Sequence, residues 1–148
     1  MEKRKPSFVD MRETKIHPET GEKLIRDVRP VTVRYEGLAR TVKLPGWYPA
    51  KRGGDGLHVG DDMAVVDRTL LELRAEVHGV LKPDEVRAIR LRLKLSQRKA
   101  GELLGGGPRA FQKYESGEVL VSKPMAQLLR LLERDPRRLK ELARDVAA

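Results

Sequence analysis

Apolar and polar residues alternate along two neighbouring segments in the first third of the chain. They read VTVRY over residues 31–35 and LARTVKL over residues 38–44, with Glu36-Gly37 between them. Alternation with a period of two predicts half-buried strands, and a glycine between two such runs predicts a tight turn. The pattern therefore predicts a β-hairpin, within a small N-terminal domain over residues 14–59. The glycine-rich loop over residues 51–56 marks the edge of this domain.

After Gly60 the apolar residues recur every three or four positions instead, which is the period of a helix with one apolar face. Asp61 and Asp62 lie where the start of a helix favours negative charge. His78-Gly79 is typical of a helix end. We therefore expect a connecting helix over residues 60–80. Its apolar stripe would consist of Met63, Val66, Leu70, Leu73 and Val77.

Residues 81–148 predict five helices and no strand. Proline suits the first turn of a helix, and serine suits the position just before it. With the hairpin, these helices predict an α+β protein, in which a small domain with a β-hairpin precedes an all-α domain. The residues that mark the helix boundaries are Pro83, Ser96, Pro108, Ser122 and Asp135-Pro136.

Three consecutive glycines, Gly105–Gly107, separate the second and third of these helices. Glycine takes backbone angles that are closed to other residues, so the chain can turn sharply here. Two short helices joined by a tight turn form a helix-turn-helix, whose second helix enters the major groove of DNA. Phe111 and Tyr114 are expected to face the core. Arg109 and Lys113 lie four residues apart and are expected to project together.

Arg109 and Lys113 are the candidates for reading DNA bases. Arginine can bind guanine through two hydrogen bonds, and lysine can reach a base or a phosphate. The start of the preceding helix, near Gln97, commonly contacts the DNA backbone in this motif. Arg98 adds an attraction that weakens with salt. The expected DNA-binding residues are Ser96, Gln97, Arg98, Arg109, Gln112 and Lys113.

The net charge of the 148-residue chain is +9, and it is unevenly spread. Residues 81–117 carry nine basic and four acidic side chains, whereas residues 61–80 carry two and five. A basic segment attracts polyanions, most often nucleic acid, although an ordinary solvated surface has the same composition. The chain has no apolar run of about 18 residues and no apolar stretch behind its basic start. We therefore expect a cytoplasmic protein without a membrane span and with a flexible tail over residues 1–13.

The chain has no cysteine, which excludes disulfides and thiolate-bound metals. His17, His58 and His78 are not at metal-ligand spacing, so neither a metal nor another cofactor is expected. No phosphate-binding loop or paired-carboxylate signature is present, and Ser96 and Ser116 have no histidine nearby in the sequence. We therefore expect no catalytic residue and no enzymatic activity.

The segment GGGPRAFQKYESG over residues 105–117 resembles the MqsA (YgiT-type) antitoxins. Their motif reads close to G-G-G-x-x-A-F-x-[RK]-Y-E-x-G. The surrounding helix-turn-helix is similar to the Xre/Cro type. The resemblance is good over residues 82–142 and weak over residues 27–50.

This resemblance implies a two-domain antitoxin of a type II toxin-antitoxin system. The C-terminal domain, over residues 81–148, would form a homodimer, bind a palindromic double-stranded DNA operator and repress its own operon. Arg109 and Lys113 fall on the base-reading positions of the family, where relatives usually carry asparagine at the first. The N-terminal domain would bind and block a cognate toxin protein, typically an mRNA-cleaving endoribonuclease.

The N-terminal domain departs from the family in one large respect. Its relatives usually carry two Cys-x-x-Cys pairs that hold a structural zinc. The corresponding stretches here read KIHPETGE over residues 15–22 and GWYPAKRGG over residues 46–54. A four-cysteine zinc site is therefore impossible. The domain must hold by its hairpin, by packing of Trp47 and Tyr48, or by its partner.

Two other functions stay open at the level of the sequence. A stand-alone Xre-type transcriptional repressor would keep the DNA binding and have no toxin partner. A module that neutralises another protein through its helices would show no salt-dependent affinity for DNA. A toxin-like reading frame beside this one would argue against the stand-alone repressor.

Overall fold

The structure is a computed structural model that describes residues 13–51 and 53–147, without the side chains of residues 144–147. All but Glu13 of the expected tail over residues 1–13 thus lies outside the described residues. Backbone contacts divide the chain into two compact units. The N-terminal unit extends to Val33 and resumes over Arg40–Asp67. The helical unit comprises Arg34–Ala39 and the chain from Arg68 onward.

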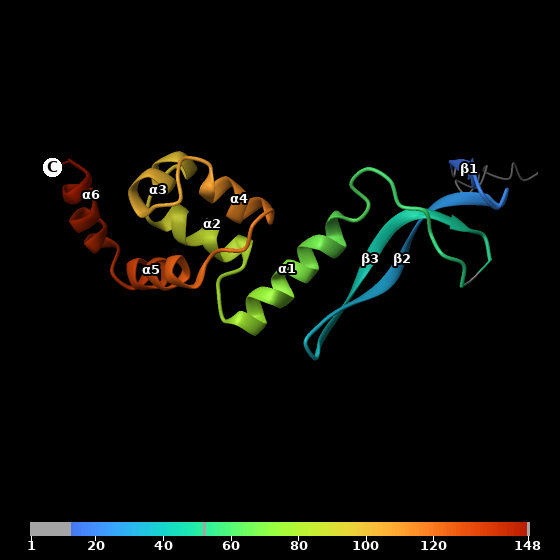
Figure 1. Ribbon diagram of the computed structural model, residues 1–148, viewed down its shortest axis with the longest axis horizontal. Helices are drawn as coiled ribbons and strands as arrows, with labels where there is room; N and C mark the ends of the chain where they lie inside the picture. Colours follow the sequence, from blue (N-terminus) through green and yellow to red (C-terminus); the bar gives the residue numbers. More distant parts are fainter. Residues whose placement is uncertain (1–12, 52, 148) are drawn as a thin grey trace, which may run out of the picture. The chain divides into compact units, whose positions relative to one another are not determined.

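A three-stranded antiparallel sheet in the order β1-β2-β3 occupies the first part of the chain (Figure 1). The short strand β1 pairs with β2 in antiparallel register, with Thr14 opposite Ile25 and Ile16 opposite Lys23. The strands are β1 (Thr14–Ile16), β2 (Lys23–Tyr35) and β3 (Leu38–Pro49).

The predicted hairpin between β2 and β3 is confirmed. Glu36 and Gly37 have φ angles of 40° and 82°, the two positive values that a type I′ turn requires. Both strands are longer than the alternating segments and run through a proline. Within the described sheet β1 pairs only with Lys23–Ile25, so Pro30 lies where β2 has an unpaired edge. Proline is tolerated there because no ladder hydrogen bond needs its missing N–H.

The helical unit receives most of α1 (Ala64–His78), which begins later than the sequence predicted. Asp61 and Asp62 lie in a turn before the helix and do not occupy its first turn. The predicted stripe is only partly right, because Leu73 is buried whereas the side chains of Met63 and Val77 are 40% and 36% exposed. The predicted end is confirmed by Gly79, whose φ of 65° stops the helix.

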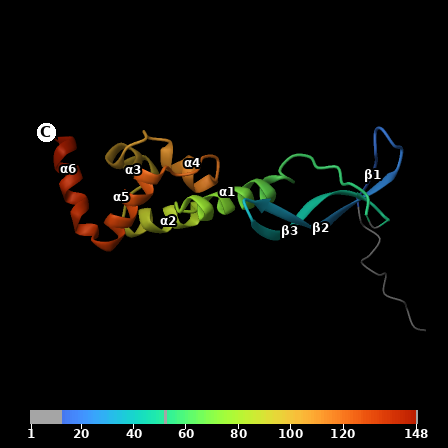
Figure 2. The same ribbon diagram turned by 60° about the horizontal axis from the view of Figure 1, so that its bottom comes forward.

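The five predicted helices of residues 81–147 are confirmed in the described part of the chain. Helices α2 to α5 form one body, and α6 turns away from the end of α5 after a short 3₁₀ turn, η2 (Figures 1 and 2). The break falls at Asp135-Pro136, as expected. The helices are α2 (Pro83–Arg92), α3 (Gln97–Leu104), α4 (Ala110–Ser116), α5 (Lys123–Arg134) and α6 (Leu139–Ala147), with η2 at Pro136–Arg138.

One apolar core joins these helices. Phe111 of α4 and Leu129 of α5 are fully buried in it, with Val86 and Ile89 of α2 beside them. Ser122 caps α5, because its hydroxyl accepts a hydrogen bond of 3.3 Å from the backbone N–H of Met125. Among the described residues, no helix is long and apolar enough to cross a membrane.

Candidate nucleic-acid interface

The helix pair α3–α4 begins with a side-chain cap. The Ser96 hydroxyl accepts a hydrogen bond of 3.1 Å from the backbone N–H of Lys99, which satisfies one of the free donors at the start of α3. Ala100, one turn later, is completely buried against the core. These two positions fix where α3 starts and which face it buries.

The turn after α3 depends on glycine in two ways, through its backbone angles and through a close contact with α3. Gly105, Gly106 and Gly107 all have positive φ, between 93° and 110°, which other residues adopt only with strain. The returning chain then passes directly over α3. A Cβ on Gly101 would lie inside the contact distance of the Gly107 carbonyl oxygen, so only glycine fits at position 101. This close approach lets the chain return against α3 before α4 begins.

Helix α4 has one buried face and one exposed face. Phe111 is fully buried, and its ring lies edge-on to Tyr114 with centroids 5.4 Å apart. Arg109, Gln112 and Lys113 are exposed on the other side. In the described structure neither Arg109 nor Lys113 has an ion-pair or hydrogen-bond partner for its side chain. Both cations are therefore available to an external anion.

The start of α4 differs by two residues from the sequence prediction. Pro108 and Arg109 form a turn, in which the N–H of Ala110 donates to the Gly107 carbonyl oxygen over 3.2 Å, and the helix begins at Ala110. Arg109 occupies the position before the helix, and its carbonyl oxygen accepts a hydrogen bond of 3.2 Å from the N–H of Lys113. The two cations still lie one helical turn apart.

A buried ion pair sets the angle between α2 and α4. Arg90 donates two hydrogen bonds to Glu115, at 2.9 and 2.7 Å, and a third to the carbonyl oxygen of Leu95, at 2.9 Å. The side chains of Arg90 and Glu115 are only 10% and 6% exposed. Because the guanidinium and the carboxylate meet through two parallel bonds, α4 has little freedom to rotate against α2.

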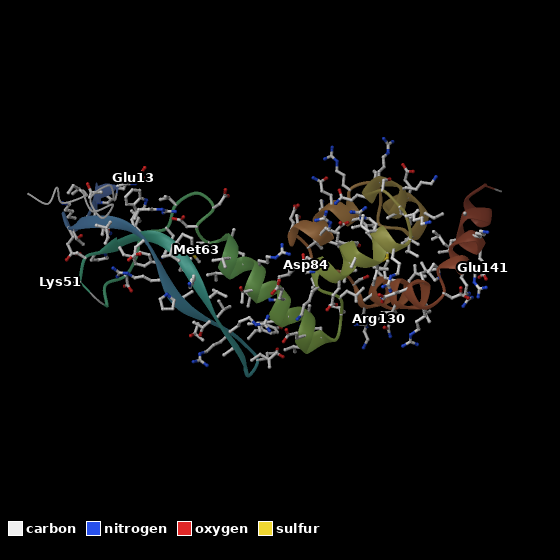
Figure 3. The ribbon with its side chains drawn as sticks, turned by 180° about the vertical axis from the view of Figure 1, so that it is seen from behind. Glu13, Lys51, Met63, Asp84, Arg130 and Glu141 are labelled. Atoms are coloured by element: carbon white, nitrogen blue, oxygen red, sulfur yellow. The ribbon has the colours of Figure 1, made fainter. Side chains whose placement is uncertain are left out.

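The other residues predicted to bind DNA lie at the start of α3 and on α4. Ser96 is exposed, but its hydroxyl oxygen is used in the cap of α3. Arg98 is 80% exposed and forms an ion pair of 3.1 Å with Glu102 of the next turn, so part of its charge is already compensated. Gln97 and Gln112 line one open groove, to which α1 and α2 also contribute side chains. Side chains that end in nitrogen project from this part of the unit (Figure 3).

Three features of this candidate interface were not predicted from the sequence. Gly101 was not singled out, and its signal is that it lies in the middle of a helix, where glycine is unfavourable. Arg90 and Glu115 are 25 residues apart and carry no local signal of pairing. Arg87 lines the same groove as Gln97 and Gln112 and is exposed on α2. Its only signal is its place in the basic segment.

Comparison with known proteins identifies the family of the chain. A family model described as the antitoxin component of a bacterial toxin-antitoxin system, MqsA, matches residues 17–143. The chain belongs to the MqsA family. The predicted resemblance is thereby confirmed, and the match includes the N-terminal unit as well as the helical one.

One curated relative matches part of the chain. Antitoxin MqsA of Escherichia coli (strain K12) is 36% identical over 70 residues, which cover 47% of this chain and 53% of the relative. The alignment thus spans about half the length of that MqsA protein.

Proposed function

We propose that this MqsA-family chain is an antitoxin that represses its own operon through the α3–α4 face and neutralises a cognate toxin through its N-terminal unit. The observation that carries the DNA-binding part is the geometry of α4. A buried face fixed by Phe111 and by the Arg90–Glu115 pair leaves Arg109 and Lys113 exposed and without protein partners in the described structure.

The proposed contacts follow from the chemistry of each side chain. Arg109 would bind a guanine edge through two parallel hydrogen bonds, and Lys113 a neighbouring base or phosphate. Gln97 and Arg87, which line one groove, would contact the sugar-phosphate backbone on either side. Arg98 would add salt-dependent attraction only, since Glu102 already compensates part of its charge.

The test is a gel-shift titration with duplex DNA from the region upstream of the protein's own reading frame. The Arg109→Ala/Lys113→Ala variant should bind about 100-fold more weakly, because each lost base contact is worth about 1–3 kcal/mol. The matched control is Arg134→Ala/Lys140→Ala, which removes the same charge from exposed positions of α5 and α6. We expect the control to lose only a few-fold. Equal affinity of the two double variants would refute the assignment.

A homodimer is the second part of the proposal. A mainly apolar pocket between α5 and α6 is lined by Leu128, Leu131, Leu132 and Leu142, together with Arg138 and Glu141, and Leu131 is 55% exposed. A large exposed leucine beside an apolar pocket favours a protein contact. Two copies related by a two-fold axis would read two half-sites of a palindromic operator, about one helical turn of DNA apart.

The toxin-binding part rests on the extent of the family match. The family model matches residues 17–143 and so includes most of the N-terminal unit. This extent favours an antitoxin over a stand-alone repressor that consists of a helix-turn-helix alone. We propose that the protein acts in the cytoplasm and is not an enzyme. We also propose that its toxin is encoded by an adjacent gene. The first activity to test for in that toxin is cleavage of mRNA. Co-expression should relieve the growth arrest that this product causes. Absence of such a gene would favour the stand-alone repressor.

A further inference from the structure

The N-terminal unit lacks the ligands for the zinc that its family implies. The chain has no cysteine. Within residues 13–51 and 53–147, no three His, Asp or Glu side chains converge on a possible metal position. Two of the histidines are also occupied, because Nδ1 of His17 and Nδ1 of His58 form hydrogen bonds with the backbone. The residues present do not fit a structural zinc.

We propose that this unit is folded without any metal and without its partner, and that an Arg26–Asp62 clamp and the packing around Trp47 and Tyr48 take the place of the zinc. The proposal concerns the fold of the N-terminal unit and is independent of whether the helical unit binds DNA. Three observations support it: one for each of the two stretches where relatives carry cysteines, and one for the clamp.

The first observation is the turn at residues 17–22, in the first of the two stretches where relatives carry cysteines. Nδ1 of His17 accepts hydrogen bonds from the backbone N–H groups of Glu19 and Thr20, at 3.1 and 3.2 Å. The backbone closes the same turn from His17 N–H to the Glu22 carbonyl oxygen over 2.8 Å. One imidazole thus organises the turn through two hydrogen bonds to the backbone.

The second observation is the packing of the other stretch, around Tyr48. The Tyr48 hydroxyl donates a hydrogen bond of 2.8 Å to the carbonyl oxygen of Leu44, and the Arg29 guanidinium lies 4.5 Å from the ring centroid. The pKa of Tyr48 is raised, mainly by its burial. A Cβ on Gly46 or Gly56 would collide with the Tyr48 or His58 rings, which shows how closely the backbone approaches them.

The third observation is the clamp itself, which joins β2 to the segment before α1. Arg26 holds Asp62 through two hydrogen bonds, one of them 2.8 Å long, and the Asp62 carboxylate also accepts one of 2.9 Å from the N–H of Val59. The Asp62 side chain is only 5% exposed. The Arg26 guanidinium lies 5.6 Å from the centroid of Trp47, so the same cation also covers the indole.

Holding the N-terminal unit together without a metal has a specific chemical consequence. A unit held by an arginine-carboxylate pair and aromatic packing has no thiolate to oxidise and no metal to remove. Its fold should therefore be indifferent to chelators and thiol oxidants, whereas metal-bound units lose folding free energy when the metal is removed.

The experiment uses the full chain and its single tryptophan, Trp47. Urea unfolding followed by Trp47 fluorescence reports on the N-terminal unit, and circular dichroism at 222 nm reports mainly on the helices. We expect the fluorescence midpoint to be the same in EDTA and in excess ZnCl2, and the purified chain to contain no stoichiometric zinc. A midpoint that falls in EDTA or rises in ZnCl2, or the absence of a cooperative fluorescence transition, would overturn the proposal.

The clamp is tested with two neighbouring aspartates. Asp62→Asn removes the charge that Arg26 binds, and Asp61→Asn removes an equal charge from an exposed position. We expect Asp62→Asn to lower the fluorescence midpoint by about 1 M urea and Asp61→Asn to leave it nearly unchanged. Arg26→Lys, which keeps the charge but not the paired bonds, should fall between them. Equal midpoints for both aspartate variants would contradict the role of the clamp.

Discussion

At the scale of single residues, the helix pair depends on a contact that has room for no side chain. Gly101 is in the middle of α3, where alanine would gain about 1 kcal/mol of helix propensity. That gain is smaller than the cost of a Cβ placed against the Gly107 carbonyl oxygen. The close approach, rather than helix propensity, therefore decides which residue position 101 accepts.

We predict that Gly101→Ala destabilises the helical unit by about 2 kcal/mol, since overpacking typically costs about 1–3 kcal/mol. Thermal unfolding followed at 222 nm measures this loss. The control is Lys99→Ala on an exposed position of the same helix, which should stay within about 0.5 kcal/mol of the parent protein. A Gly101→Ala variant as stable as the parent would show that the turn relaxes without cost.

Asp62 gives the N-terminal unit a dependence on acid. The Arg26 hydrogen bond, followed by that from the Val59 N–H, holds the pKa of Asp62 well below its usual range. Its stabilising contribution is therefore complete above the unfolded-state pKa of about 3.9 and is lost as the pH falls towards the folded-state value. We expect the urea midpoint of Trp47 fluorescence to decline progressively below about pH 4. In the Asp62→Asn variant this decline with pH should be clearly shallower. An equally steep decline in the variant would mean that other carboxylates cause the loss of stability in acid.

The caps were predictable from the sequence, whereas the clamp was not. Ser96 and Ser122 cap α3 and α5 at the expected positions because a cap depends on neighbours three residues away. Asp62 was expected to favour a helix start, yet it binds Arg26, 36 residues earlier. Local preference carries no information about a pairing of that kind, which only the folded chain brings together.

At the scale of elements, the Arg90–Glu115 pair joins α2 to α4 and so positions the proposed recognition helix. Replacing one partner leaves the other charge buried without compensation, which costs about 3–5 kcal/mol, whereas replacing both with apolar residues is often neutral. The order of the secondary-structure elements along the chain was predicted well, including the hairpin and the five helices. The angle between α2 and α4 was not, because it depends on this long-range pair.

We predict that Arg90→Met lowers the unfolding free energy of the helical unit by about 3 kcal/mol. The double variant Arg90→Met/Glu115→Leu should recover most of this loss, and chemical unfolding at 222 nm measures both. Arg98→Ala serves as the comparison, because its exposed pair with Glu102 should contribute less than about 0.5 kcal/mol. If the double variant is no more stable than Arg90→Met, the uncompensated charge is not the cause of the loss.

At the scale of the whole molecule, assembly was the least predictable property. Leu91 and Leu131 are exposed to nearly the same extent, 54% and 55%, and the sequence does not distinguish them. Leu131 lines the pocket between α5 and α6, and Leu91 is not among the residues that line it. The proposed dimer therefore rests on three-dimensional placement, not on composition.

Leu131→Asp should therefore shift the protein from dimer to monomer in sedimentation velocity, because a charge would have to be buried in the apolar contact. Leu91→Asp, with the same change at equal exposure, should leave the dimer intact. DNA affinity of the Leu131→Asp variant should fall together with dimerisation. If both variants sediment as the parent protein does, the α5–α6 pocket is not the dimer contact.

The course of the chain between its two units restricts how the protein can be cut into fragments. The chain passes from one unit to the other after Val33, after Ala39 and after Asp67. Tyr35 belongs to the helical unit, where its hydroxyl lies 3.0 Å from Nε2 of His78 and its ring 5.6 Å from the Arg74 guanidinium. A fragment started at Arg68 would omit this tyrosine, and a single proteolytic cut within α1 would leave two pieces held together only by non-covalent contacts, such as those of Tyr35 with His78 and Arg74. Dissection by truncation therefore yields an incomplete helical unit, and point substitutions are the sounder route to separating the two proposed activities.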